Sequence, residues 1–237
     1  MEAHTATSEA FLSYAERLVH RGLVCNTLGN IAVAIADSRL PNGKGLLTKR
    51  KGVSLEEATI EDLVVTGVDC QSLYWGTIPP SGGHLLSQRI FSINSTNGIE
   101  AIVHTHPDAL IGFLSQLEPA EFDFVSVDTA IVLGGPPKFF DYGINPEADA
   151  RLVKDDDLKA TCLVMPNHGL TTLGRSLSEA YHRHTSMVAE VNRLIIATLV
   201  AGARGSRVRF TPSADTTQLY SLGTGFIYGI NNAMKLK

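Results

Sequence analysis

The stretch Glu100-Ala-Ile-Val-His-Thr-His-Pro107 decides how this chain is interpreted. Its first residues are apolar and β-branched, which is typical of a strand, and Pro107 ends the strand because proline has no backbone N–H to donate. Side chains two positions apart on a strand project from the same face, so the imidazoles of His104 and His106 can reach one ion. The segment therefore predicts a strand that carries two candidate metal ligands at its end.

A third histidine stands in a similar place. His168 lies in Met165-Pro-Asn-His-Gly169, directly after a predicted apolar strand at residues 161–165. Three imidazoles with one open position are a common arrangement for catalytic zinc. We therefore predict that His104, His106 and His168 bind one divalent ion, zinc first, with manganese, cobalt or iron as alternatives. The residues alone leave open that these are hydrogen-bonding loop histidines.

The composition is that of an ordinary globular protein. Of the 237 residues 44% are hydrophobic and 19% are charged, and the formal net charge is −4. This balance predicts neither a nucleic-acid nor a membrane partner, because basic clusters are short and the longest apolar run, around residues 194–203, falls well below the roughly 20 residues that span a bilayer. The isolated cysteines (Cys25, Cys70 and Cys162) predict free thiols in a reducing compartment, and hence a cytoplasmic protein. With no linker or repeat, we expect a single domain over residues 1–237.

Strand and helix patterns alternate along the chain. A helix is predicted after Ser8 and should stop near Gly22, and another is predicted at residues 85–93. Ser176 and Glu179 have the spacing of a capping box, and they precede the clearest helix, in which His184 belongs to the apolar face and is predicted to lie in the core. Strands are predicted at residues 31–35, 46–48, 61–66, 130–133 and 161–165. The pattern indicates an α/β layered domain.

Several motifs stand in an order that resembles the class II aldolase/adducin family, which includes fuculose- and rhamnulose-phosphate aldolases, ribulose-phosphate 4-epimerase and related decarboxylases. The matching pieces are Gly29-Asn-Ile-Ala-Val33, Leu47-Thr48 to Gly52, Glu61-Asp-Leu-Val-Val65, Ile102-Val-His-Thr-His-Pro107, Tyr142-Gly143, Asn167-His-Gly-Leu170, Gly174 and Glu179-Ala180. The resemblance implies a three-layer αβα fold with a central mixed, largely antiparallel sheet. It also implies a metal held by the three histidines, and a tetramer whose active site lies at the subunit interface.

The chain departs from this family at the position of the acid/base. The family's aldolases carry P-S-S-E before the helix that precedes the H-x-H strand, whereas this chain has Pro80-Ser-Gly-Gly-His84. Gly83 then stands at the position of the glutamate, and the carboxylate is missing. His84 could serve as a substitute base or as a fourth ligand. Alternatively, it is a solvent-facing histidine at the start of a helix.

The expected phosphate pocket has also changed. Where the aldolases usually read T-P-S-G, this chain has Thr48-Lys-Arg-Lys-Gly52, which is one residue longer. The added cations suggest that a carboxylate or phosphate is bound by Lys51, Gly52, Ser81 and Asn30. The alternative is a solvated basic turn. Tyr228 matches a tyrosine that some relatives use in catalysis, and it could instead be a packing anchor.

These observations predict a metal-dependent lyase that cleaves a C–C bond next to a carbonyl in a small anionic metabolite. Loss of the glutamate slightly favours decarboxylation of a hydroxy- or oxo-acid, such as an intermediate of aromatic degradation, because a departing carboxylate needs no base. An aldolase that uses His84 as its base is the close alternative. An epimerase or dehydratase, or a non-catalytic adducin-like scaffold, is a further alternative, although such scaffolds lose the histidines that this chain keeps.

Overall fold

The computed structural model describes residues 4–68, 73–76, 79–94, 98–115, 122–140 and 150–223. Its centre is one eight-stranded sheet in the order β4-β3-β2-β1-β5-β8-β7-β6. Every neighbouring pair is antiparallel except β6 and β7, which are parallel. The strands are β1 (Asn30–Ala36), β2 (Lys44–Lys49), β3 (Leu63–Gly67), β4 (Leu73–Trp75), β5 (Ala101–Thr105), β6 (Lys138–Phe139), β7 (Cys162–Met165) and β8 (Gly169–Gly174).

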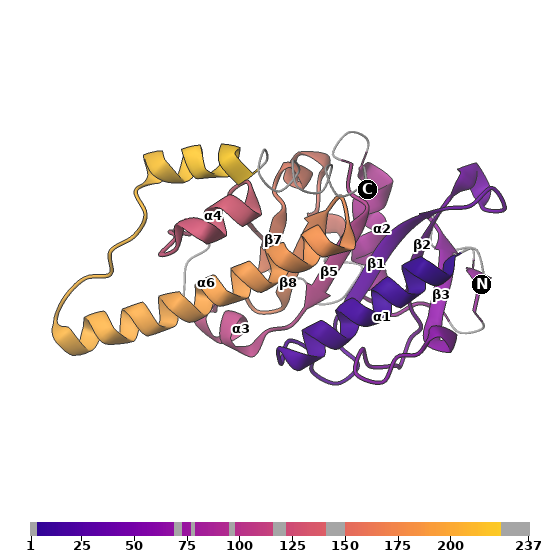
Figure 1. Cartoon of the computed structure of the whole chain (residues 1–237), viewed down its shortest axis with the longest axis horizontal. Helices are drawn as coiled ribbons and strands as arrows, with labels where there is room; N and C mark the ends of the chain where they lie inside the picture. The colour runs from indigo at the N-terminus through magenta and orange to yellow at the C-terminus, as the bar shows by residue number, and fades with distance from the viewer. Residues whose placement is uncertain are drawn as a thin grey trace.

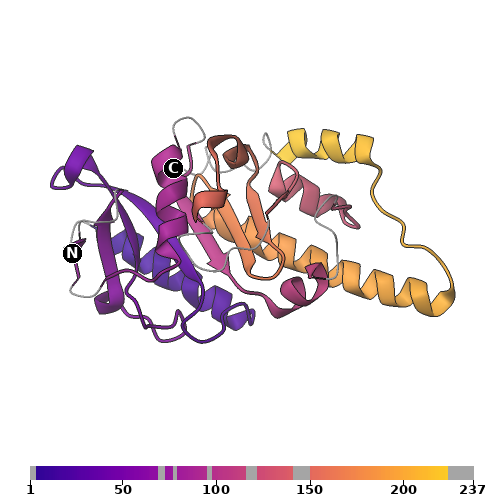
Figure 2. The same cartoon turned by 180° about the vertical axis from the view of Figure 1, so that it is seen from behind.

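Helices cover both faces of this sheet, as Figure 1 and the reverse view in Figure 2 show. One face carries most of the helices, and the other carries α2 (His84–Ile93) together with the short 3₁₀ helix η4 (Asp155–Lys159). The helices are α1 (Thr5–His20), α2 (His84–Ile93), α3 (Asp108–Leu114), α4 (Val127–Leu133), α6 (Leu177–Arg204) and a last one at residues 213–223, and the 3₁₀ turns are η2 (Pro41–Gly43), η3 (Ile60–Asp62) and η4 (Asp155–Lys159). The predicted three-layer αβα fold with a mixed, largely antiparallel sheet is confirmed.

Strand alternation divides the core into two clusters. In β5, Ala101 and Val103 pack with α1, α3, α4 and α6, whereas Ile102 packs on the α2 side. The same alternation continues in β7 and β8, as expected for successive side chains that point to opposite faces. It follows that His104 lies on the α2 face and Thr105 on the α6 face.

Two of the predicted strands differ in the structure. Residues 130–133 belong to helix α4, not to a strand. The buried carboxylate of Glu190 accepts hydrogen bonds from the Val125 and Ser126 amides (2.5 and 3.0 Å), directly before this helix, which stabilises its N-terminal end. The predicted strand at 61–66 begins later, since Ile60–Asp62 form η3 and β3 starts at Leu63.

The long helix α6 begins as predicted, with the Ser176 side chain accepting from the Glu179 amide. The Glu179 carboxylate completes the cap one residue earlier than expected, at the Arg175 amide (2.7 Å). With 28 residues, α6 is long and apolar enough to cross a membrane, the one such helix among the described residues. It packs against β8 and β5, however, and its buried side chains include Glu179, Arg183 and Glu190, so it is a core helix.

Candidate metal centre

Strand β5 places the two histidines of the H-x-H motif. His104 is the cross-strand neighbour of Asn30 on β1 and of Thr171 on β8, so it sits in the middle of the sheet. His106 follows the last residue of β5, and Pro107 then provides the N-cap of α3. The chain therefore leaves the sheet directly after the second histidine, as the sequence predicted.

His168 reaches this pair from the turn between β7 and β8. Its amide donates to the Met165 carbonyl (2.9 Å), which closes the turn. The turn lies against β5 so closely that a Cβ atom on Gly169 would meet the Thr105 carbonyl oxygen at 2.5 Å and the His106 ring at 2.9 Å. Only glycine fits there, and this close approach brings the third imidazole to the other two.

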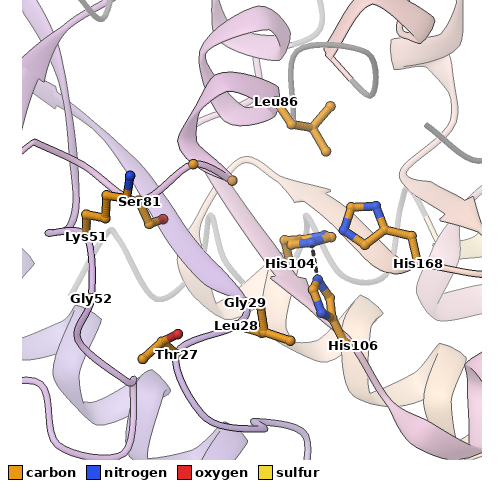
Figure 3. A pocket seen from close by; sticks show the side chains of 12 residues that line it. Thr27, Leu28, Gly29, Lys51, Gly52, Ser81, Leu86, His104, His106 and His168 are labelled. Carbon is orange, nitrogen blue, oxygen red and sulfur yellow. Dashed lines mark hydrogen bonds between the residues drawn. The ribbon is translucent and has the colours of Figure 1, made fainter. Parts of the chain in front are cut away.

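The three imidazoles converge, as Figure 3 shows. Their ring centroids are 4.8–5.2 Å apart, and the Nε2 atoms of His104 and His106 are 2.9 Å apart. One ligand nitrogen from each ring lies within 4.8 Å of the others, and this is the group of metal-binding side chains that the described residues assemble.

The surroundings of His104 and His106 favour the neutral form of their rings, which binds metals. Burial lowers the pKa of His106 to about 4, and burial together with the neighbouring His106 and His168 holds the pKa of His104 well below its usual range. Neutral imidazole is the ligating form. The Nδ1 atom of His104 lies 2.8 Å from the Thr171 hydroxyl, which leaves Nε2 directed at the other two rings. The donor set therefore fits a divalent ion.

The histidines form one end of a cavity of about 280 Å³. At its other end lie Lys51 and Ser81, with Gly52 beside them (Figure 3). Backbone hydrogen bonds from Lys51 to Pro79 (2.8 Å) and from Ser81 to Lys49 (3.3 Å) hold the two segments of this end together. The remaining lining residues are Thr27, Leu28, Gly29, Gly82, Gly83 and Leu86, so no carboxylate lines the cavity among the residues that the structure describes.

The three consecutive cations of the predicted anion site do not lie together. Lys51 alone of the three lines the cavity. Arg50 pairs with Asp62 at 2.7 Å. Lys49 is fully buried, and its ammonium donates to the Thr27 and Val53 carbonyls (2.9 and 2.8 Å). Of the added cations, Lys51 alone therefore lies where it could contact the substrate's anion, and the segment is not a solvated turn throughout.

His84 does not reach the metal site or the cavity. It is 1% exposed, its Nε2 lies 2.9 Å from the Thr66 hydroxyl on β3, and burial lowers its pKa to about 4. In this structure His84 is therefore neither a base that faces the cavity nor a fourth metal ligand. The alternative of a solvent-facing histidine is also wrong. The preceding Gly83 lines the cavity instead, where an added Cβ atom would make only ordinary contacts, the nearest at 3.5 Å from Asn30.

Two other candidates lie outside the cavity lining or outside the described residues. Asn30 is buried behind Gly83, with its amide 3.4 Å from the Ser87 hydroxyl. Tyr228 and the motif Tyr142-Gly143 lie outside the described residues.

Sequence reasoning missed the side chains that support the metal ligands. Thr171 orients His104, and His184 of α6 contacts the hydroxyls of Thr105 (2.7 Å) and Thr172 (3.2 Å) on the opposite face. The prediction that His184 is a core histidine is confirmed, since it is fully buried. Alternation along β8 would have placed Thr171 and Thr172 on opposite faces, but no sequence signal gave the strand pairing.

The comparison with protein families decides the classification. The model described as Class II Aldolase and Adducin N-terminal domain matches residues 9–192. The chain belongs to the class II aldolase/adducin family. Membership supports a metal-dependent lyase activity of the aldolase type, a small substrate and an oligomeric assembly.

Solved structures support the same fold. YgbL from Escherichia coli, described with aldolase, epimerase and decarboxylase as alternatives, superposes with a TM-score of 0.76 at 19% identity over 92% of this chain and 100% of that one. An L-fuculose 1-phosphate aldolase gives 0.74 at 16% identity over 91% and 95%. The L-fuculose-1-phosphate aldolase of Thermus thermophilus gives 0.68 at 22% identity over 83% and 96%. No curated protein matches the chain.

Proposed function

We propose that His104, His106 and His168 bind one divalent cation, zinc first. The convergence of three imidazole rings, each with a ligand nitrogen within 4.8 Å of the others, supports this assignment. A bound divalent ion supplies Lewis acidity to a substrate carbonyl oxygen. Thr171 would keep the His104 ring in its ligating orientation.

We propose decarboxylation of a small hydroxy- or oxo-acid as the reaction. The observation that carries this preference is the cavity lining, in which the described residues include no carboxylate and Gly83 contributes no side chain. The resemblance in sequence gives Gly83 the place of the family's glutamate. In a decarboxylation of this kind the substrate carries a carbonyl β to its carboxylate: the bond between the carboxyl carbon and the α carbon breaks, its electron pair moves through the α carbon to the oxygen of that carbonyl, carbon dioxide leaves, and a proton then returns to the α carbon. The bond-breaking step needs no base, which suits this lining.

The other end of the cavity suits a second acidic group of the substrate. Lys51 supplies a cation, Ser81 a hydroxyl, and Gly52 its backbone at a left-handed position (φ 83°). A carboxylate or a phosphate is recognised by such charged hydrogen bonds. Asn30 would support this end from behind Gly83, and Tyr228 stays a candidate for the acid that protonates the product.

An aldolase is the second candidate. Several of the similar structures are named as sugar-phosphate or fuculose-phosphate aldolases, and the Lys51–Ser81 end would also accept a phosphate. A retro-aldol cleavage, however, needs a base for the substrate hydroxyl, and His84 is buried against Thr66. The base would have to come from elsewhere.

Product analysis separates the two reactions. The zinc-loaded chain is incubated with a panel of hydroxy- and oxo-acids and of sugar phosphates, and carbon dioxide and aldehyde are measured. We expect carbon dioxide from an acid, and its loss in His104→Ala together with the bound zinc, while the control His182→Ala, which alters an exposed α6 histidine, keeps both. Aldehyde release from a sugar phosphate without carbon dioxide from any acid would establish the aldolase instead.

We also propose a homotetramer with the cavity near a subunit interface. The support is the end of α6, which extends beyond the sheet (Figure 1) and exposes Ile196, Leu199 and Val200 (62, 68 and 45%). Apolar side chains at this spacing form one stripe of a helix, and such patches mark protein interfaces. Sedimentation of the full chain tests this, and Leu199→Glu is expected to dissociate the assembly. A monomeric unsubstituted chain would refute the proposal.

A further inference from the structure

Lys49 is the one member of the basic run whose burial needs an explanation. Strand β2 ends at this residue, and its side chain is fully buried although lysine is almost never found so. Among the described residues no carboxylate lies within ion-pair distance of its ammonium. Burial lowers the pKa of Lys49 to about 8. A buried charge without a counter-ion destabilises a fold, so packing alone does not account for this lysine.

The two carbonyls that accept from Lys49 belong to two segments that are far apart in the sequence from the histidines and that contribute to the lining of the cavity or adjoin it. Thr27 is the first residue of the lining segment 27–29. Val53 directly follows Lys51 and Gly52, which also line the cavity. A second hydrogen bond joins the residues next to them, from the Ser54 hydroxyl to the Asn26 carbonyl at 2.6 Å. The Lys49 ammonium therefore joins these two segments by hydrogen bonds, although Lys49 itself does not line the cavity.

The segments that Lys49 joins have strained or irregular backbone. Asn26 has a left-handed φ of 50°, and Gly29 and Gly52 have φ values of 80° and 83°. Loops of this kind bind an anion well only when their conformation is fixed beforehand, because ordering them on binding weakens affinity. A positive charge held behind them also favours an anion in front of them.

We propose that Lys49 is a positioning residue for the anion end of the cavity, where its charged ammonium holds segments 27–29 and 51–53 in the arrangement that receives the substrate's acidic group. This inference rests on the proposed function, since it assumes that the Lys51–Ser81 end binds an anion. It assigns different roles to Lys49 and Lys51, because the second lines the cavity and the first acts through the backbone.

The test uses inorganic phosphate as the probe and the full chain freed of metal, so that phosphate cannot bind through an ion. Isothermal titration at pH 7 compares the unsubstituted chain with Lys49→Met, Lys49→Arg and the control Lys44→Met, which removes an exposed lysine from the same strand. We expect Lys49→Met to weaken phosphate binding about tenfold or more, as for the loss of a charged hydrogen bond. Lys49→Arg should restore most of the affinity, and Lys44→Met should leave it unchanged.

Zinc titration and denaturant unfolding accompany each variant. Zinc affinity should change much less than phosphate affinity, because the two hydrogen bonds of Lys49 reach the Thr27 and Val53 carbonyls and none of the three histidines. If Lys49→Met does not fold, Lys49→Gln carries the test, since it keeps N–H donors but no charge, and the same weakening is expected. A folded neutral variant that binds phosphate like the unsubstituted chain, with only its unfolding midpoint lowered, would overturn the proposal in favour of a structural role. If the unsubstituted chain binds zinc but no phosphate, the anion end itself is wrong, and the role of Lys49 falls with it.

Discussion

Replacing Thr171 by valine should weaken the metal centre without touching a ligand. The Thr171 hydroxyl lies 2.8 Å from Nδ1 of His104, and the two side chains are buried. Nε2 of His104 faces His106, so in the metal-bound state Nδ1 carries the hydrogen and donates it to Thr171. Valine has nearly the same shape but no acceptor, so this buried N–H loses its hydroxyl partner.

The size of the effect follows from the difference between the two states. Without metal, His104 can move its hydrogen to Nε2 and donate to Nε2 of His106 at 2.9 Å, which avoids the buried unpaired donor. When Nε2 binds the metal, the hydrogen cannot move there. The free energy of metal binding therefore becomes less favourable by most of the roughly 1–3 kcal/mol that an unsatisfied buried group costs. Since about 1.4 kcal/mol corresponds to tenfold in affinity, we expect zinc to bind about 10- to 100-fold more weakly.

Competition with a chromophoric zinc chelator measures this affinity directly on the full chain. Thr171→Ser keeps the hydroxyl and should bind zinc nearly as well as the unsubstituted chain. Thr172→Val is the matched control, because it makes the same change one residue along β8, where the hydroxyl faces His184 and Ala180 on the opposite side of the sheet. Equal zinc affinities for Thr171→Val and Thr172→Val would show that the hydroxyl does not orient His104.

Three further predictions concern the cavity and the buried histidines. Lys51→Gln should raise the KM for an acidic substrate about tenfold or more, while Arg50→Gln, whose side chain pairs with Asp62, should leave KM unchanged in the same steady-state assay. Gly83→Glu should fold with an unfolding free energy within about 1 kcal/mol of the unsubstituted chain, because a Cβ atom at this position makes only ordinary contacts. The variant should also gain aldehyde release from sugar phosphates. If it stays inactive on them, the lack of a base is not what prevents aldol cleavage. Burial lowers the pKa of His84 to about 4 and that of His184 to about 3, below the ordinary value of 6.5, so the unfolded chain binds more protons below that value. Urea unfolding of the metal-free protein should therefore show stability that is nearly full above about pH 7 and falls by about 2 kcal/mol per histidine as the pH is lowered to about 5.

The features that sequence reasoning predicted well are those set by local periodicity. Alternation around residues 100–106 placed two histidines on one face at the end of a strand, and Pro107 marked where the strand stops. The Ser176 cap and the apolar face of α6 are likewise local patterns. Residues 130–133 show the limit, since four apolar residues fit a strand or a helix equally well until Glu190, far along the chain, binds the amides at one end.

Burial of polar side chains was the part that local patterns could not provide. A histidine at the start of a helix is usually exposed, but α2 begins so close to β3 that the His84 ring meets Thr66 within the fold. The resemblance to the family singled out Gly83 as the position of the missing carboxylate, and Gly83 lines the cavity. It could not indicate that the adjacent histidine points away from the cavity.

The basic run at the end of β2 shows why the environment of a charged side chain could not be predicted from the sequence. Lys49, Arg50 and Lys51 carry the same charge, yet one is buried under two loops, one pairs with Asp62 and one lines the cavity. Alternation turns successive side chains to opposite faces while the strand lasts, and beyond Lys49 the chain bends into the turn that contains Gly52. In the sequence these three residues form one basic cluster, whereas in the structure the end of the strand directs their side chains to different places. Three neighbouring residues of one charge can therefore occupy three different environments, and only one of them, Lys51, lines the cavity.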